Sequence, residues 1–353
     1  MDKIMNQINI NHPLYKEDMQ VVMSSIDIEL LKDKKILITG ATGLIGSHLI
    51  DALMCFNQKG ARIHIYAIGR NRAKISSRFG CYIGNPYFTF IEHDVVQPFA
   101  EDVSVDIIIP AASNTHPLAY SQHPIDTMWI NIMGCKHALE LAVRCNAQVL
   151  YLSSVEIYGN PYDNNAFKEE STGALNLSNA RSCYTESKRS CEALCQSYMA
   201  EYKLDVKIVR LCRVFGPTLL DNDTKASSQF LLKSIHNEDI VLKSEGNQLF
   251  SYMYVTDAVV ALLYILLYGQ TGKSYNASNR YCNIRLRDFA QLCADYNGKK
   301  VVYELPPEEE RKGYSIANNA LLDNSALRNI GWKEHYLMAD AVQRTIRMLS
   351  KTD

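Results

Sequence analysis

Short apolar strands alternate with amphipathic helices between residue 34 and about residue 217, and this alternation constrains the fold more than any other feature. Strands are expected at 34–40, 61–69, 87–95, 105–113, 147–154 and 206–216, and helices at 40–54, 127–146 and 184–202. Such an order builds βαβ units, whose strands lie parallel and whose helices cover both faces of the sheet. The sequence therefore predicts an α/β fold with a doubly wound parallel sheet.

The rest of the chain is less regular. A helix is expected around 225–236, a hairpin around 240–250 and a second helix at 257–267. At roughly 150 residues per domain, 353 residues suit about two domains. We therefore expect an N-terminal extension over 1–33 that packs on the body, a main domain over 34–217, and a smaller α/β lobe over 218–353 that is interleaved with it.

Composition excludes several classes of protein. The 37 Lys and Arg nearly balance the 38 Asp and Glu, so the basic excess of a nucleic-acid binder is missing. No apolar run reaches the roughly 18 residues of a membrane span. The opening MDKIMNQINI lacks the apolar core of a signal peptide, so a cytoplasmic location is expected. The ten cysteines form no CxxC pair, and we expect reduced cysteines and no metal site.

Three glycines stand where a predicted strand meets a predicted helix, in the sequence GATGLIG. Gly40 permits a tight turn, Gly43 lets the backbone approach a pyrophosphate, and Gly46 lets the helix pack close to the sheet. The N-terminus of the helix would bind phosphates through its free N–H groups. The pattern predicts a dinucleotide site, and the alternative is a glycine turn needed for packing alone.

The end of the second strand bears on which dinucleotide is bound. An acidic residue there would accept a hydrogen bond from the ribose 2′-OH of NAD, but this chain has Gly69 and Arg70. A glycine leaves room for a 2′-phosphate and a guanidinium matches its charge, which favours NADP over NAD. NAD stays open if Arg70 only stacks on the adenine. Asp94, after the third strand, is either a partner of the adenine amino group or a solvated loop acid.

Small side chains follow the fourth strand, where Ala111, Ala112 and Ser113 would let a cofactor pass close to the backbone. A nicotinamide cofactor, NAD(P), is therefore expected along the ends of the strands. The complete set of expected cofactor contacts is Gly40, Thr42, Gly43, Leu44, Ile45, Gly46, Arg70, Asp94, Val95, Ala111, Ala112, Ser113, Asn131, Tyr184, Lys188 and Leu211.

A candidate catalytic set is formed by Ser154, Tyr184 and Lys188. The sequence YTESK places Tyr184 and Lys188 one helical turn apart, on the same face. A nearby ammonium and a nicotinamide cation favour the phenolate, so the tyrosine can act as a base near neutral pH. Ser154 ends the fifth strand, where its hydroxyl could hold the substrate oxygen. A YxxxK match can arise by chance in a chain with 21 tyrosines, but its position on this helix favours function.

These motifs, in this order, resemble the extended short-chain dehydrogenase/reductases, and within them the NAD-dependent epimerase/dehydratase family. The similar stretches are GATGLIGSHL, VDIIIPAAS, SSVEIYG, YTESK, VRLCRVFGP, YVTDAV and SYNAS, and they cover about residues 35–333. The resemblance implies an NAD(P)-binding Rossmann domain over 34–217 and a substrate-binding lobe over 218–353. It also implies transient oxidation of a small-molecule substrate, a nucleotide sugar, by the bound cofactor.

Within the family, the stretch RSCYTESKR is similar to UDP-glucuronate decarboxylases. Family dehydratases and decarboxylases place a carboxylate where Glu156 stands in SSVEIYG, near C5 of the sugar. A 4-keto group acidifies the C5 proton, and a positioned carboxylate can remove it. Glu156 could equally be a surface or ion-paired acid. Val155 replaces the acid that 4,6-dehydratases carry beside this glutamate, which argues against loss of the 6-hydroxyl.

The lobe departs from the family pattern. Phe250 stands where an arginine clamps the substrate's diphosphate in the family, and 319–321 reads Asn-Ala-Leu in place of an arginine-proline pair. Lys225 also replaces a commoner arginine. Arg213, after the sixth strand, could place a charge near the active site or form a structural pair. The expected substrate contacts are Arg213, Lys225, Gln229 and Tyr252.

Three functions are compatible with these residues. The first is a lyase or isomerase that works through a 4-keto nucleotide sugar and epimerises, eliminates or decarboxylates. The second is an NADPH-dependent reductase or dehydrogenase of a sugar or polyol derivative, favoured by Arg70. The third is a catalytically silent NAD(P) sensor, against which the intact catalytic set argues.

The resemblance further implies a homodimer. Family dimers pair the two helices near 127–145 and 184–202 into a four-helix bundle. On these helices Met128, Ile132, Cys191 and Leu194 either face a partner or face the sheet.

Overall fold

A parallel sheet of seven strands forms the main domain of this computed structural model, and it confirms the expected α/β class. The structure describes residues 8–115, 117–304 and 319–350. The seven strands are β1 (Lys35–Thr39), β2 (His64–Gly69), β3 (Phe88–Glu92), β4 (Ile107–Pro110), β5 (Gln148–Ser154), β6 (Val206–Leu211) and β10 (Ser274–Ala277). Their order is β10-β6-β5-β4-β1-β2-β3, so the first strand lies inside the sheet and the chain winds outward in both directions.

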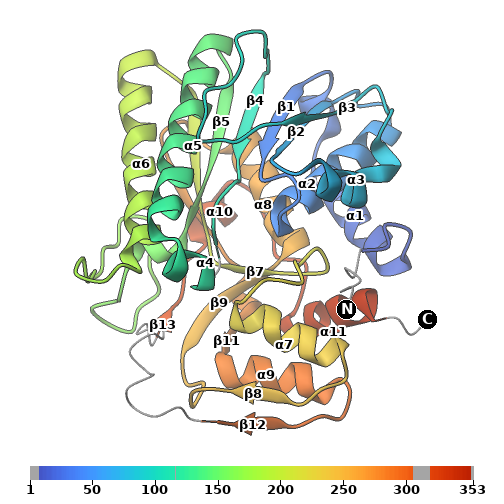
Figure 1. Cartoon of the computed structure of the whole chain (residues 1–353), viewed down its shortest axis with the longest axis vertical. Coiled ribbons are helices and arrows are strands. Elements are labelled where there is room, and N and C mark those ends of the chain that lie inside the picture. The colour runs from blue at the N-terminus through green and yellow to red at the C-terminus, as the bar shows by residue number, and fades with distance from the viewer. Residues whose placement is uncertain (1–7, 116, 305–318, 351–353) are drawn as a thin grey trace.

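Helices cover both faces of this sheet, because side chains of alternate strand residues point to opposite faces. Ile36 and Ile38 join the larger apolar core, and Leu37 between them joins the smaller one. Figure 1 shows α5 and α6 side by side along one edge of the molecule, where they contact each other extensively. The helices around the sheet are α2 (Leu44–Gln58), α3 (Arg72–Phe79), α4 (Pro117–Gln122), α5 (Pro124–Cys145), α6 (Ser182–Tyr202) and α8 (Val255–Tyr268).

The lobe, which contains β9, α7 and α9, lies below the large sheet in the view of Figure 1. Its strands are β7 (Arg213–Phe215), β8 (Ile240–Leu242), β9 (Leu249–Tyr254), β11 (Asn283–Arg285), β12 (Val301–Tyr303) and β13 (Asn319–Ala320). Its helices are α7 (Ala226–Ile235), α9 (Leu286–Asp295) and α11 (Met338–Leu349), whereas the short α10 (Ser325–Asn329) contacts β10 of the large sheet. Between lobe segments the chain returns to the main domain, where α8 packs on the large sheet and β10 becomes its edge strand.

The hairpin expected around 240–250 is wrong. β8 pairs in parallel with β12, whereas β9 pairs with β7, β11 and β13. Both segments are strands, but each finds its partner elsewhere in the chain. Strand periodicity cannot identify these partners, because it reports which side of a strand is buried and not which strand lies beside it.

The N-terminal extension packs on the main domain through a helix that periodicity did not predict, α1 (Pro13–Ser25). It contacts α2, α8 and α11. Its buried Asp18 accepts hydrogen bonds from the Tyr254 and Tyr336 hydroxyls at 2.6 and 2.7 Å, and from Arg344 Nη2 at 2.8 Å. Polar residues therefore hold this helix, which explains why an apolar pattern does not reveal it.

Four short 3₁₀ turns complete the described structure: η1 (Ile28–Leu31), η2 (Gly80–Tyr82), η3 (Val155–Tyr158) and η4 (Arg280–Cys282). Over the described ranges, no helix has the length and apolar character needed to cross a membrane. Seven cysteines are buried, including Cys191, so this residue faces the core and not a partner.

Candidate active site

The glycine turn joins β1 to α2, beside the end of β4. Gly40 has φ +64°, and a Cβ there would lie 2.8 Å from the Ala111 carbonyl oxygen. A Cβ on Gly46 would lie 2.5 Å from the Gly40 carbonyl oxygen. Close backbone packing therefore requires glycine at both positions.

Gly43 differs from its two neighbours in the motif. A Cβ there would contact only the Gly40 oxygen, at 3.2 Å. Gly43 is the N-cap of α2 and provides no side-chain cap, so Thr42, Leu44 and Ile45 surround a helix N-terminus whose first N–H groups can meet an anion. Packing alone does not explain this glycine, and the turn fits a bound pyrophosphate.

Arg70 and Asp94 lie at the ends of the neighbouring strands β2 and β3, as the cofactor prediction requires. Arg70 Nη1 lies 3.8 Å from Asp94 Oδ2, and 63% of the Arg70 side chain is exposed. Asp94 also accepts a hydrogen bond from the Val96 amide at 3.2 Å, while Val95 is buried. An exposed pair of this kind is weak, so the guanidinium can reorient toward a ligand phosphate.

A chain of side-chain hydrogen bonds joins the end of β4 to α5 and α6. Ser113 donates to Asn131 Oδ1 at 2.7 Å, Asn131 Nδ2 donates to Ser187 Oγ at 2.8 Å, and Ser187 donates to the Tyr184 carbonyl at 2.9 Å. The Ala112 amide donates to Thr39 at 3.0 Å. These contacts hold the tyrosine helix against the strand ends, where Ala111 and Leu211 also lie.

The structure brings Ser154, Tyr184 and Lys188 together. Ser154 ends β5 and accepts a hydrogen bond from the Glu156 amide at 3.2 Å. Tyr184 and Lys188 project from the first turns of α6. Lys188 is buried, donates to the Leu152 carbonyl at 2.8 Å and lies 5.1 Å from the centre of the Tyr151 ring.

Burial controls the protonation of these groups in the protein alone. It raises the pKa of the Tyr184 phenol above the ordinary value, and the hydrogen bond with Ser154 opposes this rise. Burial also lowers the pKa of the Lys188 ammonium. The phenol therefore holds its proton until a further positive charge is bound nearby.

A second group of side chains borders this set. Arg213 Nη2 lies 3.3 Å from Glu156 Oε1, and Arg213 Cζ lies 3.6 Å from the centre of the Phe250 ring. The Glu156 side chain is 40% exposed and that of Arg213 is 19% exposed. Arg213 of β7 is therefore held between Glu156 and Phe250 of β9.

Tyr120 was missed by the sequence reasoning. Its ring centre lies 5.6 Å from that of Tyr184, and its hydroxyl is 3.4 Å from Arg181 Nη2. Burial raises its pKa to about 12, although the charges of Arg181 and Arg213 act in the opposite direction. No local motif marks this tyrosine, because only the fold places α4 over α6.

Three of the four expected substrate contacts have other partners. Lys225 Nζ pairs with Asp223 Oδ2 at 2.6 Å, and Gln229 donates to the Asp223 carbonyl at 2.5 Å. Tyr252 is fully buried and packs on Phe289, with ring centres 5.0 Å apart. The strand alternation turns the Tyr252 ring into the core of the lobe, and its role as a substrate contact stays a prediction.

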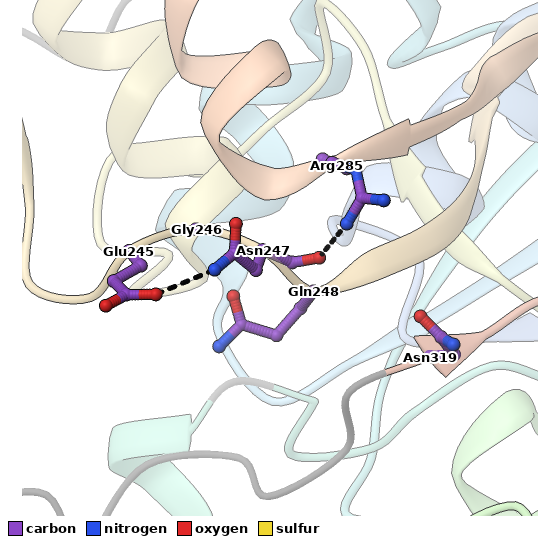
Figure 2. A pocket seen from close by; sticks show the side chains of 6 residues that line it. All are labelled: Glu245, Gly246, Asn247, Gln248, Arg285 and Asn319. Atoms are coloured by element: carbon purple, nitrogen blue, oxygen red, sulfur yellow. Dashed lines mark hydrogen bonds between the residues drawn. The ribbon is translucent and has the colours of Figure 1, made fainter.

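The lobe holds a polar cavity of about 390 Å³ (Figure 2). Glu245, Gly246, Asn247, Gln248, Arg285 and Asn319 line it. Arg285 donates to the Asn247 carbonyl at 2.8 Å, and the Asn247 amide donates to Glu245 at 2.7 Å. The Gln248 Oε1 atom is buried and has no hydrogen-bond partner among the described residues. Gln248 directly precedes β9, two residues before Phe250.

Comparison with known proteins places the chain in a family. Residues 36–278 match the model of the NAD dependent epimerase/dehydratase family. The chain belongs to this family. It is 30% identical over 322 residues to UDP-glucuronic acid decarboxylase 1 of Xenopus tropicalis, covering 90% of this chain and 72% of that protein. It is 33% identical to UDP-glucuronic acid decarboxylase 6 of Arabidopsis thaliana, over 67% of each chain.

Solved structures share the fold. A dTDP-glucose 4,6-dehydratase from Streptomyces venezuelae with NAD bound has a TM-score of 0.76 and 22% identity, over 89% of this chain and 96% of that chain. A UDP-glucuronic acid 4-epimerase mutant from Bacillus cereus, in complex with a UDP-sugar and NAD, has a TM-score of 0.76 and 19% identity, over 89% and 98%. The family match and the relatives confirm the expected class, an enzyme of the NAD-dependent epimerase/dehydratase type.

Proposed function

We propose that this protein binds a nucleotide sugar, oxidises C4 of the sugar, and then epimerises or decarboxylates the 4-keto sugar before reducing it again. The observation that carries the proposal is the arrangement of Ser154, Tyr184 and Lys188, in which Lys188 lines one small pocket with Thr39, the residue before the glycine turn. The Glu156 amide donates to Ser154 at 3.2 Å. The decarboxylase relatives support a nucleotide sugar as substrate. Val155, an apolar and buried residue, argues against loss of a 6-hydroxyl.

Each side chain of the set has a defined task in this proposal. Bound NAD(P)⁺ would supply the hydride acceptor and a second positive charge in addition to that of Lys188. Tyr184 takes the proton of the C4 hydroxyl, and Ser154 orients that hydroxyl by a hydrogen bond. Lys188 places its positive charge one helical turn from Tyr184, where it favours the phenolate. Glu156 removes or returns a proton at the neighbouring carbon, which the ketone has made acidic.

The test is to incubate the purified protein with UDP-glucuronate, UDP-glucose and dTDP-glucose, and to follow product mass and absorbance at 340 nm. We expect a product of equal mass or one that has lost carbon dioxide, without net accumulation or loss of reduced cofactor. Loss of water would indicate dehydration. Stoichiometric consumption of NADPH with a keto sugar would refute the proposal and favour a reductase.

The cofactor preference is a finer part of the proposal. We propose that Arg70 favours NADP, because its largely exposed guanidinium can pair with a 2′-phosphate. Arg70→Ala should weaken NADP binding about tenfold and leave NAD binding within about twofold, measured by fluorescence titration. Tighter binding of NAD than of NADP by the wild-type protein would contradict this preference. An NADP preference would also keep the reductase as the second candidate.

We also propose that the polar lobe cavity holds the nucleotide. Its volume of about 390 Å³ suits a small-molecule site, and its amide groups offer both donors and acceptors. Successive residues of an extended chain rise about 3.3 Å each, so Gln248 lies roughly 7 Å from Phe250. A ligand with its base near Gln248 can therefore reach the catalytic set with its sugar.

A homodimer in the cytoplasm is the remaining expectation. The outer surface of α5 exposes Ile125 and Trp129, at 70% and 53%, which favours α5 as a contact with a second copy. Sedimentation of the purified protein measures this directly, and a monomer at micromolar concentration would contradict it.

A further inference from the structure

Arg213 is a cation whose hydrogen bonds are only partly used, and it lies beside the catalytic set. It begins β7, where it pairs in parallel register with Tyr252 of β9. Its guanidinium carbon lies 3.6 Å from the centre of the Phe250 ring, so the planar cation stacks on the ring. A stacked guanidinium directs its N–H groups sideways, along the plane of the ring. Phe250 thus fixes the direction in which Arg213 can bind an acceptor.

Glu156 uses only one nitrogen of this guanidinium. The contact joins Nη2 to Oε1 at 3.3 Å, which is long for a charge-assisted hydrogen bond. Within the described residues, Nη1 is buried and has no hydrogen-bond partner. Buried donors are nearly always paired in folded proteins, and an unpaired one costs about 1–3 kcal/mol. Without a bound ligand, Arg213 therefore has fewer hydrogen-bond acceptors than its N–H groups can use.

The position of Arg213 indicates which ligand group would supply the missing hydrogen-bond acceptors. Glu156 is linked through its amide to Ser154, which ends β5 beside the tyrosine helix α6, so the arginine borders the sugar end of the proposed site. An anionic group on the sugar would lie next to the Glu156 carboxylate. Only a cation between the two would make that arrangement stable, and Arg213 occupies this place.

We propose that Arg213 is a specificity-determining residue that binds a carboxylate on the sugar ring, so that the enzyme prefers a nucleotide-linked hexuronate to a neutral hexose. This inference rests on the proposed function, since it presupposes that a nucleotide sugar binds. The diphosphate of the same ligand is a second source of anionic oxygens. A neutral nucleotide sugar separates the two, because it carries the diphosphate and lacks the carboxylate.

The experiment measures binding of UDP-glucuronate, UDP-glucose and UDP by calorimetry to the full chain carrying Tyr184→Phe, which prevents turnover. We expect UDP-glucuronate to bind at least about tenfold more tightly than UDP-glucose. Adding Arg213→Gln should weaken the binding of UDP-glucuronate about tenfold or more and change the affinity for UDP-glucose less than about threefold. Adding Glu156→Gln should have the opposite effect on affinity. It should strengthen the binding of UDP-glucuronate relative to UDP-glucose, because the Glu156 carboxylate no longer competes for Arg213.

Arg280→Gln is the matched control, since this arginine pairs with Glu334 in another part of the lobe and should leave all three affinities unchanged. Equal weakening of all three ligands by Arg213→Gln would assign the arginine to the diphosphate and overturn the inference. Unchanged affinities for all three ligands after Arg213→Gln would mean that the arginine only supports Glu156. This result would also overturn the inference. Failure of the wild-type protein to bind or convert any nucleotide sugar would overturn the proposed function as well.

Discussion

Replacing Tyr184 with phenylalanine is expected to lower kcat by about 10³-fold, within the range of 10² to 10⁴ that positioned acid–base groups contribute. The change removes one hydroxyl and keeps the ring, whose centre lies 5.6 Å from that of Tyr120. Without the hydroxyl, the C4 proton has no acceptor beside Ser154. Product formation from a nucleotide sugar, followed by mass, measures the loss.

Tyr202→Phe is the control for this prediction, because Tyr202 lies at the far end of the same helix and is 51% exposed. It should keep full activity. Both variants should retain the circular dichroism and cofactor binding of the parent protein. Activity of Tyr184→Phe above about one tenth of the wild-type value would show that another group is the base.

The second large effect concerns stability, and we expect Asp18→Ala to reduce the free energy of unfolding by about 3–5 kcal/mol. Asp18 is completely buried and accepts hydrogen bonds from Tyr254, Tyr336 and Arg344. The variant leaves two hydroxyls without their acceptor and removes the charge that compensates Arg344. Equilibrium unfolding in urea measures the difference.

Glu17→Ala provides a control on the same arginine. Glu17 pairs with Arg344 Nη1 at 3.0 Å, but its side chain is 60% exposed. Solvent screens such a pair, so this variant should cost less than about 1 kcal/mol. Similar losses for both variants would contradict the view that the buried carboxylate anchors α1.

Local features of the sequence identified six of the seven strands of the main sheet, but not the edge strand β10, and the strand expected at 206–216 is divided between β6 of this sheet and β7 of the lobe. Each of the six predicted strands overlaps an observed one, and the helices expected at 127–146 and 184–202 appear at Pro124–Cys145 and Ser182–Tyr202. Apolar periodicity identifies these elements because both faces of a parallel sheet are buried. It failed for α1, whose attachment depends on Asp18, and for the partners of β8 and β9.

The residues of the candidate site also fall into two groups, those that local sequence patterns identify and those that only the fold brings together. Gly40, Gly43 and Gly46, and the YTESK stretch, are local patterns whose spacing alone implies their chemistry. Tyr120 and the stacking of Arg213 on Phe250 bring together residues from α4, β7 and β9.

The sequence by itself therefore determined the α/β class, and it identified the glycine turn and the tyrosine–lysine pair as candidates, because residues close in sequence encode each of them. Only the tertiary structure decided that Arg213 meets both Glu156 and Phe250 while Tyr252 turns into the core. The physical reason is that strand pairing sets which side chains become neighbours. That pairing depends on the packing of the whole lobe, and no short stretch of sequence records it.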